Sequence, residues 1–339
     1  MIKIIVDCFG GDHCPQAPVE AAVNALAKNK DLHLILTGDE TILHQCLEGK
    51  SYDAARLEIE HAPEVIGCDE KPTDVVRLKR NSSMMKGIIM LRDRDDIAAL
   101  VSTGSTGALV TGALVRLGRI PGIIRPAFCP ILPTMDGGIV GICDSGANVE
   151  VTSAHLRQFA IMASLYLENV YGVAKPRVAL LNVGKEAEKG DDMRREAYSL
   201  LQETPSVNFV GNMESRDLLS GSYDVVVADG FSGNVLVKTT EGTALELLGK
   251  LKKEIFSRML YKLGALLMKK MFADLKAFMN YQNYGGSVLL GTSKVVVKGH
   301  GSSKAVAIEK CIEQAYRMEV SKLSAKIETE IAKYEHYED

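Results

Sequence analysis

The chain has 339 residues, of which 46% are hydrophobic and 24% are charged, with 30 glycines and 10 prolines. This balance excludes an intrinsically disordered chain and indicates a globular protein with a large core. The formal net charge of −3 argues against general nucleic-acid binding, because that function usually needs a basic face. The length allows either two average domains or one large α/β domain.

The seven cysteines are scattered along the chain, without a CxxC pair or a Cys/His cluster at zinc-ligand spacing. We therefore predict no metal site and a reducing, cytoplasmic location. Met1 leads directly into the strand-like segment IKIIVD, so we expect no signal peptide. The uncharged stretch 97–115 is long enough to cross a bilayer. Its polar centre, STGSTG, instead favours a strand, a tight loop and a helix.

Short β-branched runs alternate with longer helical patterns along the chain. The predicted strands are Ile2–Val6, Leu32–Leu36, Ala98–Ser102, Gly138–Ile142, Arg177–Asn182, Val207–Val210, Asp224–Ala228 and Lys294–Val297. The predicted helices are Pro18–Lys28, Thr106–Leu117, His155–Val170, Asp191–Glu203 and Lys304–Glu319, followed by a charged helix that closes the chain. This alternation predicts an α/β protein with a mostly parallel sheet covered by helices on both faces. We expect one catalytic domain over residues 1–339.

The segment Gly249–Gln282 does not fit this alternation. It holds eight Lys or Arg residues against one Glu and one Asp, within a chain whose total charge is negative. Its apolar spacing predicts a helix, then a nearly uncharged tip, then a second helix. The apolar residues of the predicted tip are Leu263, Leu266, Leu267 and Met268. We therefore predict an amphipathic helical hairpin that projects from the sheet domain.

Glycine-rich turns recur between apolar strands and helices. There are five of them, at residues 10–13, 102–107, 182–185, 229–234 and 299–303. Turns that follow parallel strands leave the same edge of a sheet, so we expect them to face one crevice. Glycine lets the backbone approach a ligand closely, and free N–H groups at a helix start favour an anion. The five turns together predict a site for phosphate or a phosphorylated ligand, although each single glycine could serve a steric purpose alone.

The standard cofactor motifs are missing. The chain has no GxxxxGK[ST] motif, and no GxGxxG follows a strand, so neither ATP nor NAD is indicated. GxSxG, SxxK and HExxH are also missing, which removes the common hydrolase and metalloprotease motifs. We predict no cofactor.

Seven motifs, in this order along nearly the whole chain, resemble the phosphate acyltransferase (PlsX) family of phospholipid synthesis. They are GGDHCPQAP, STGSTGALV, DSGANVE with HLRQFA, LLNVGKEAEKG, DVVVADGFSGNVLVKTTEG, YGGSVLLG and HGSS. The chain departs from the family pattern at Cys8 and Phe9, at Ser287 and Val288, and at Lys185, where the family commonly has an acidic residue. The departures leave the glycines unchanged.

This resemblance implies transfer of an acyl group from acyl carrier protein to inorganic phosphate, which gives acyl phosphate. It also implies a homodimer with a Rossmann-like fold related to phosphate acetyltransferases and isocitrate-type dehydrogenases. A membrane-bound glycerol-3-phosphate acyltransferase would take up the product. Short-chain phosphate acetyltransferase activity on a coenzyme A thioester remains an alternative, as does a non-catalytic lipid- or carrier-binding scaffold. A metal-dependent dehydrogenase lacks support from the residues.

The candidate site residues lie in or beside the turns. Phosphate is already largely doubly charged at pH 7, so the site must orient it and supply donors and cations rather than a general base. Lys238 is the cation we favour most. The candidate catalytic residues are Lys238, His13, Asp229, Asn234 and His300, and the candidate phosphate- or substrate-binding residues are Gly10, Gly11, Asp12, Ser105, Thr106, Gly107, Lys185, Gly233 and Ser302.

Several of these residues have a second interpretation. His13 and His300 could bond only to backbone, and Asp229, Asn234 and Asp12 could only cap or brace their turns. The predicted hairpin could serve a dimer, an anionic membrane surface or the acidic carrier protein.

Overall fold

The computed structural model describes residues 1–67, 69–278 and 284–334, and its strands form two sheets. The first has seven strands in the order β3 (Leu57–His61), β2 (Leu32–Gly38), β1 (Ile2–Asp7), β4 (Ile97–Ser102), β12 (Val295–Lys298), β11 (Ser287–Leu290) and β5 (Ala127–Cys129). The second has five, in the order β6 (Ile131–Pro133), β7 (Ile139–Cys143), β10 (Val225–Val227), β8 (Arg177–Leu181) and β9 (Asn208–Met213). Only β11 and β6 run antiparallel to their neighbours, β11 to both β12 and β5, and β6 to β7.

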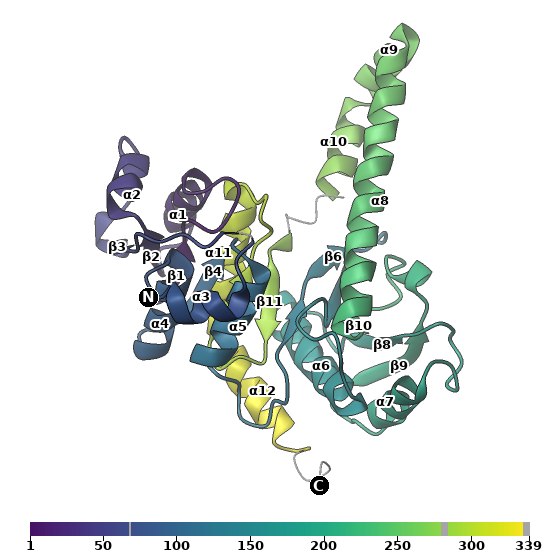
Figure 1. Cartoon of the computed structure of the whole chain (residues 1–339). Helices are drawn as coiled ribbons and strands as arrows, with labels where there is room; N and C mark the ends of the chain where they lie inside the picture. Colours follow the sequence, from purple (N-terminus) through teal and green to yellow (C-terminus); the bar gives the residue numbers. More distant parts are fainter. Residues whose placement is uncertain (68, 279–283, 335–339) are drawn as a thin grey trace.

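Helices cover both faces of the seven-stranded sheet (Figure 1). Along β1, Ile4 and Val6 face the side of α1 (Gln16–Lys28) and α11 (Ala305–Val320). Ile5 faces the opposite side, where it packs with residues of α3 (Pro72–Leu78), α4 (Ser83–Asp93) and α5 (Thr106–Arg116). Successive strand residues point to opposite faces, which explains why a wholly apolar run forms a strand buried on both sides. Helix α2 (Glu40–Leu47) lies beside β2 and β3.

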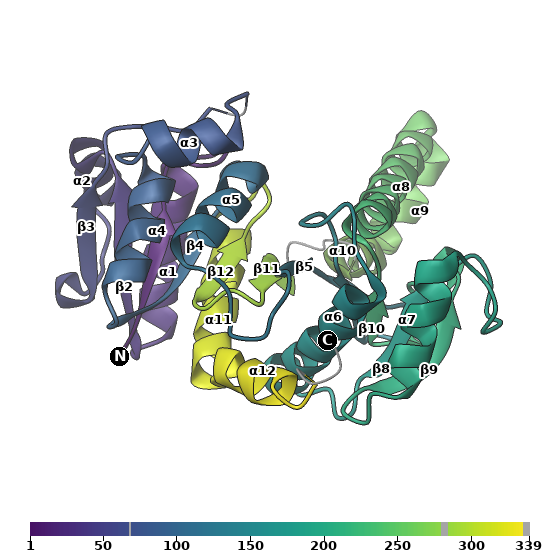
Figure 2. The same ribbon diagram turned by 60° about the horizontal axis from the view of Figure 1, so that its bottom comes forward.

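The second sheet is also covered on both faces. On one face lie α6 (Ser153–Tyr166), the π-helical turn Leu167–Tyr171 and α7 (Asp192–Gln202). On the other, Val237 of α8 (Gly230–Ser257) packs against Val140 and Val226. Helix α12 (Leu323–Ile331) follows α11 and packs on α6 (Figure 2).

One hydrophobic core joins the two sheets. Buried residues of β1 and β4 belong to the same cluster as Phe159 and Tyr166 of α6 and as Val178 of β8. The mostly parallel α/β architecture predicted from the alternation is confirmed. The strands form two sheets rather than one, and these adjoin at β5 and β7, which are in contact but belong to different sheets. We propose that the shared core makes the chain a single domain.

A helical hairpin projects from the body as predicted, but it starts earlier and is built from three helices (Figure 1). Helix α8 begins at Gly230, directly after β10, and its far half forms the first arm. The extended backbone of Arg258 (φ −135°, ψ 144°) ends it, and α9 (Met259–Leu267) and α10 (Lys269–Phe278) follow. The predicted tip residues Leu263, Leu266 and Leu267 lie in α9 itself, with Met268 as its C-cap. Residues 279–282 of the prediction lie outside the described residues.

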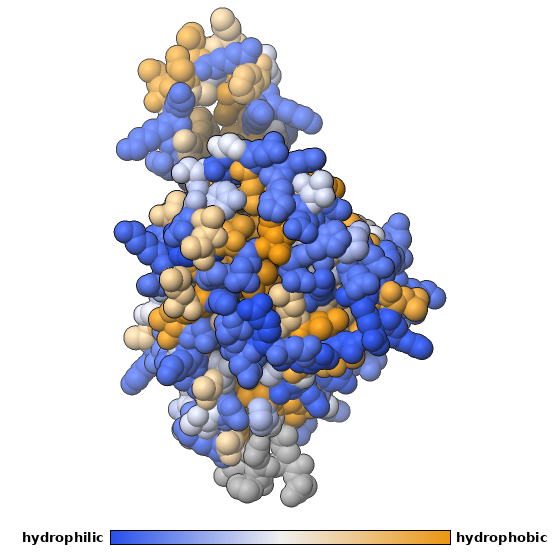
Figure 3. Space-filling view, turned by 90° about the vertical axis from the view of Figure 1, so that its left-hand side faces the viewer, coloured by the Kyte–Doolittle hydropathy of each residue, from blue (hydrophilic) through white to orange (hydrophobic). Residues whose placement is uncertain are grey.

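No residue of α9 is buried. Leu267 is 90% exposed, and apolar residues gather at the far end of the projection beside basic ones (Figure 3). Among the described residues, no helix is both long and apolar enough to cross a membrane.

Candidate active site

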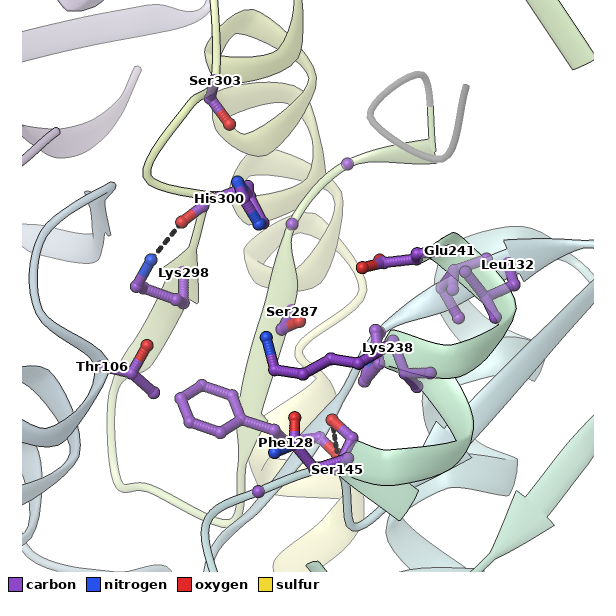
Figure 4. A pocket seen from close by; sticks show the side chains of 18 residues that line it. Thr106, Phe128, Leu132, Ser145, Lys238, Glu241, Ser287, Lys298, His300 and Ser303 are labelled. Atoms are coloured by element: carbon purple, nitrogen blue, oxygen red, sulfur yellow. Dashed lines mark hydrogen bonds between the residues drawn. The ribbon is translucent and has the colours of Figure 1, made fainter. Parts of the chain in front are cut away.

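A cavity of about 340 Å³ lies between the two sheets (Figure 4). Six parts of the chain supply its walls: the start of α5, the β5–β6 connection, the loop after β7, α8, and the segments before β11 and after β12. Figure 4 labels ten of the lining residues, which are Thr106, Phe128, Leu132, Ser145, Lys238, Glu241, Ser287, Lys298, His300 and Ser303. The cavity is therefore assembled from both sheets rather than along one edge.

The turns after β1, β4 and β12 pack on one another. The backbone N–H of Asp12 donates to the Gly301 carbonyl at 2.9 Å. A Cβ at Gly10 would lie 2.7 Å from the Gly104 Cα, and a Cβ at Gly11 would lie 2.5 Å from the Thr103 Oγ1. Side chains at these two positions would force the turns apart. The structure thus brings three of the five predicted turns together, and their glycines have a packing reason.

Asp7, at the end of β1, supports these turns through hydrogen bonds. Its carboxylate accepts hydrogen bonds from the Ser102 hydroxyl at 2.6 Å and from the Phe9 N–H at 3.2 Å. Ser102 in turn accepts from the Gly104 N–H at 3.1 Å. Burial raises the pKa of the Asp7 carboxyl, an effect that these hydrogen bonds oppose. Asp7 is not among the residues that line the cavity, so we assign it a supporting role.

The start of α5 forms one wall of the cavity. Ser105 is the N-cap of this helix and accepts a hydrogen bond from the Ala108 N–H at 3.5 Å. Thr106, the first helical residue, lines the cavity. A Cβ at Gly107 would lie 2.7 Å from the Pro72 Cγ, so Gly107 allows α5 to approach α3. The first turn of α5, where a helix carries partial positive charge, therefore borders the cavity at Thr106.

The start of α8 forms the opposite wall. Asp229 caps it by accepting from the Ser232 N–H at 2.8 Å, and its other oxygen pairs with Arg194. Asp229 therefore braces its turn, in agreement with the second interpretation of this residue, and it does not line the cavity. Asn234 does line it. A Cβ at Gly233 would lie 1.9 Å from the Asp144 carbonyl oxygen, so only glycine fits where α8 crosses the loop after β7.

That loop is organised by Asp144, which the sequence analysis did not single out. The Asp144 carboxylate accepts from the backbone N–H of Phe128 at 2.9 Å, of Ser145 at 2.6 Å and of Asn148 at 2.6 Å. Burial raises the pKa of Asp144, and these donors oppose the rise. The Asp144 side chain thereby holds Ser145 and Gly146 against the cavity. In the sequence, the DSGAN motif was the feature that could have pointed to Asp144.

Two lysines and a histidine bring positive charge to the cavity. Lys238 reaches in from α8, whereas Lys298 comes from the end of β12 on the other side (Figure 4). The Lys298 ammonium donates to the Gly299 carbonyl, and burial lowers its pKa to about 8. The Nδ1 of His300 lies 2.8 Å from the Ser302 hydroxyl, and burial, with the two lysines nearby, lowers the pKa of His300. Lys298 was missed because it belongs to a strand rather than to a glycine turn.

A clamp behind the cavity holds the segment before β11. The Gln314 side chain of α11 accepts from the Gly286 N–H at 2.8 Å and donates to the Gly286 carbonyl at 3.1 Å. The Tyr171 hydroxyl donates to the Tyr284 carbonyl at 3.1 Å, and Gln314 also donates to Tyr166. Gly285 and Gly286 line the cavity, so these buried side chains fix one of its walls from the outside.

Of the candidate catalytic and binding residues, only Thr106, Asn234, Lys238 and His300 line the cavity. Lys185 forms an ion pair with Asp217 at 2.7 Å, which raises the pKa of Lys185, and it does not line the cavity. His13 is exposed at the first turn and does not line the cavity either. Asp12 lies beside Gly301, at the rim. Within the part of the chain that the structure describes, no cluster of three or more His, Cys, Asp or Glu residues could hold a metal ion.

Solved structures with a similar fold include two phosphotransacetylases. One from Staphylococcus aureus superposes with a TM-score of 0.59 at 17% identity, and one from Streptococcus pyogenes with 0.59 at 16%. In both comparisons 94% of each chain is covered. The fold thus belongs to the Rossmann-like α/β class of the phosphotransacetylases, as the resemblance implied.

The sequence comparisons define the family. The model of a family described as fatty acid synthesis protein matches residues 2–326. Phosphate acyltransferases from Geobacillus thermodenitrificans and Bacillus subtilis are 44% and 42% identical, over 97% of this chain and 99% and 98% of theirs. The chain belongs to the phosphate acyltransferase family, and it is an acyltransferase.

Proposed function

We propose that this protein transfers a long-chain fatty acyl group from the thioester of acyl carrier protein to inorganic phosphate, giving acyl phosphate for phospholipid synthesis. The observation that carries the proposal is the cavity between the sheets, which Lys238 and Lys298 line from opposite sides together with Thr106 at the start of α5. Two cations and a helix start suit a doubly charged phosphate. Family membership supports the same reaction.

The proposed reaction needs no general base. A phosphate oxygen attacks the thioester carbonyl carbon, the new C–O bond forms, and the C–S bond breaks with its electron pair going to sulfur. The leaving thiolate has an ordinary thiol pKa of roughly 8.5. With its pKa lowered to about 8, the Lys298 ammonium is well matched to donate a proton to that sulfur. Lys238 is then the cation that holds phosphate.

Backbone N–H groups of the first turn of α5, which starts at the cavity-lining residue Thr106, would support the carbonyl oxygen as it becomes an oxyanion. The segment at Gly285 and Gly286 forms the facing wall, where the Gly286 N–H is already donated to Gln314. Preorganised donors of this kind stabilise charge that develops in the transition state. Asn234 and His300 line the cavity, so we propose that they contact the reactants. Gly10, Gly11, Asp12 and Ser302 do not line it, and we assign them a supporting role.

The reaction can be tested by measuring free thiol released from palmitoyl-carrier protein, with and without phosphate, and with acetyl-coenzyme A as the comparison donor. Phosphate-dependent release from the palmitoyl donor is expected. Release from acetyl-coenzyme A alone would assign a short-chain phosphate acetyltransferase instead. Binding without release from either donor would leave a scaffold that binds lipid or carrier.

We further propose a homodimeric, cytoplasmic enzyme whose projecting helices contact an anionic membrane surface. Unburied apolar residues of α9 lie beside several lysines, a composition that suits the boundary between water and an anionic bilayer. Such contact would pass a poorly soluble acyl phosphate to a membrane-bound glycerol-3-phosphate acyltransferase. The basic arm of α8 would also suit the acidic carrier protein.

A double variant, Leu266→Asp with Leu267→Asp, tests the membrane contact. It should abolish co-sedimentation with vesicles that contain phosphatidylglycerol while thiol release in solution stays unchanged. Val320→Asp, at an exposed apolar position on the body, is the matched control and should still sediment. Loss of the dimer in size-exclusion chromatography would assign the tip to subunit contact instead.

A further inference from the structure

A smaller apolar cavity adjoins the candidate active site. Its volume is about 40 Å³ in the free protein. Leu132 and Glu241 line both cavities, so the two lie next to each other. The remaining walls are mainly apolar and come from β6 and the turn after it, from Leu219, from α8 and from the end of α10. We call this space the apolar groove.

Helix α8 runs from one cavity to the other. Asn234 and Lys238 line the polar cavity, Glu241 lines both, and Ala244 lines the apolar groove. These residues are spaced by three or four positions and so lie on one side of the helix. With a rise of 1.5 Å per residue, the ten positions from Asn234 to Ala244 span about 15 Å. One helix side therefore joins a cationic end to an apolar end.

The groove has a buried floor and an exposed rim. Leu132 is only 4% exposed and belongs to the core cluster that holds the second sheet against α8. Met135, at the rim, is 65% exposed and has a flexible thioether side chain. Burial also raises the pKa of Glu241, which fits a carboxyl group at the border of an apolar region.

We propose that the apolar groove holds the fatty acyl chain of the substrate, and that Ala244 and Leu132 set the preference for chain length. An occupant of both cavities must be anionic or polar at one end and extended and apolar at the other. An acyl thioester facing phosphate, and the acyl phosphate product, both have this form. The inference rests on the proposed function and adds a binding site for the part of the substrate that does not react.

The position of the groove has a second consequence. Phe278 of α10 forms part of its wall, so both arms of the projection border the place where the chain would lie. An acyl chain longer than the groove would leave it along the base of the projecting helices. The apolar surface of α9 lies farther along the same projection (Figure 1).

Filling the groove with a larger side chain tests the inference. Ala244→Phe should lower kcat/KM for a 16-carbon acyl-carrier donor about tenfold or more, while kcat/KM for an 8-carbon donor changes less than twofold. A tenfold effect corresponds to about 1.4 kcal/mol, the free energy of burying roughly two methylene groups. Thr243→Phe, at the neighbouring exposed position, adds the same ring outside the groove and should leave both donors unchanged.

The measurements separate the outcomes. Equal changes for both donors in Ala244→Phe, or the same selective loss in Thr243→Phe, would overturn the acyl-chain site. An unchanged long-chain rate in Ala244→Phe would overturn it as well. Failure of the unaltered enzyme to release thiol from any carrier donor would overturn the proposed function itself. Thermal unfolding of both variants shows that any loss comes from folded protein.

Discussion

Glycines of the body and glycines of the projecting helices have opposite surroundings. In the body, a Cβ at Gly233 or Gly286 would lie 1.9 Å or 2.5 Å from a backbone carbonyl oxygen. In the projection, a Cβ at Gly242, Gly249 or Gly264 would meet nothing within 4 Å. Glycine in a helix interior costs about 1 kcal/mol relative to alanine. Gly233 and Gly286 are thus explained by packing within this chain, whereas Gly242, Gly249 and Gly264 are not.

The largest effect is expected from Gly233→Ala. The new methyl group would collide with the Asp144 carbonyl and separate α8 from the loop that Asp144 holds. We expect the free energy of unfolding to fall by about 3 kcal/mol and thiol release to be lost. Urea unfolding measures the first effect. Phe231→Ala, at an exposed position in the same turn, is the control, and equal stability of the two variants would refute the close contact.

Gln314→Leu should have the next largest effect. It removes both hydrogen bonds between the buried Gln314 side chain and the partly buried Gly286, which together contribute about 2 kcal/mol. Because the freed segment lines the cavity, kcat should fall more than the phosphate KM rises. Lys310→Leu, one turn earlier on α11 and partly exposed, should change neither constant. A purely structural role would lower stability and leave kcat of the folded enzyme intact.

Lys238→Ala tests the proposed phosphate cation. The fold should persist, since the Lys238 side chain extends into the cavity rather than into the core. A hydrogen bond to a charged group contributes about 1.5 to 3 kcal/mol, so the phosphate KM should rise at least about tenfold. Lys252→Ala, on the exposed arm of α8, is the control. Unchanged phosphate kinetics would remove Lys238 from the site.

The pH dependence tests Lys298. Because its pKa is lowered to about 8, the folded protein loses this proton as the pH rises through 8, while the unfolded chain keeps it to about 10.4. Activity should therefore decline above pH 8. Between these two values the unfolded state binds more protons, so Lys298 contributes stability that increases with pH. Lys298→Met should remove both dependences, and a retained decline would assign it to another group.

The smallest effect is expected from Gly249→Ala. The added methyl group meets open space in the single chain, so helix propensity should raise the free energy of unfolding by about 0.5 to 1 kcal/mol. Differential scanning calorimetry of the pure protein measures this gain. A loss of stability would mean that a second subunit or another partner packs closely on that glycine. In that case the glycines of the projection would be explained by contacts with a partner, and those of the body by contacts within the chain.

Most of the parallel strands could be predicted because they are long apolar runs. All eight predicted strands are found, at slightly shifted bounds. Strand β3 was missed because its sequence, LEIEH, is half polar, and β5 and β6 were missed because they have three residues each and flank Pro130. Strand β11 was recognised only as part of a motif. Which strands share a sheet depends on contacts between distant segments, and the pattern of one chain does not encode those contacts.

The site could be predicted only in part, for a similar reason. Glycine turns mark where the backbone must come close, so the meeting of Gly10, Gly104 and Gly301 follows from a local signal. The roles of Lys298 and Gln314 depend on where β12 and α11 lie, and neither residue stands in a recognisable turn. Lys185 follows a glycine but lies on the second sheet, where it pairs with Asp217. The catalytic and binding roles assigned to these residues stay predictions.

The strand order also bears on how the protein is made. Strand β4 lies between β1 and β12, yet β12 begins at residue 295 of 339, after the whole second sheet has been synthesised. While the ribosome is still translating, the first sheet therefore has an unpaired strand edge that later residues must fill. Lys298 and His300 emerge at the same late stage. A chain cut short before this point would lack Lys298 and His300, and with them one cationic wall of its cavity.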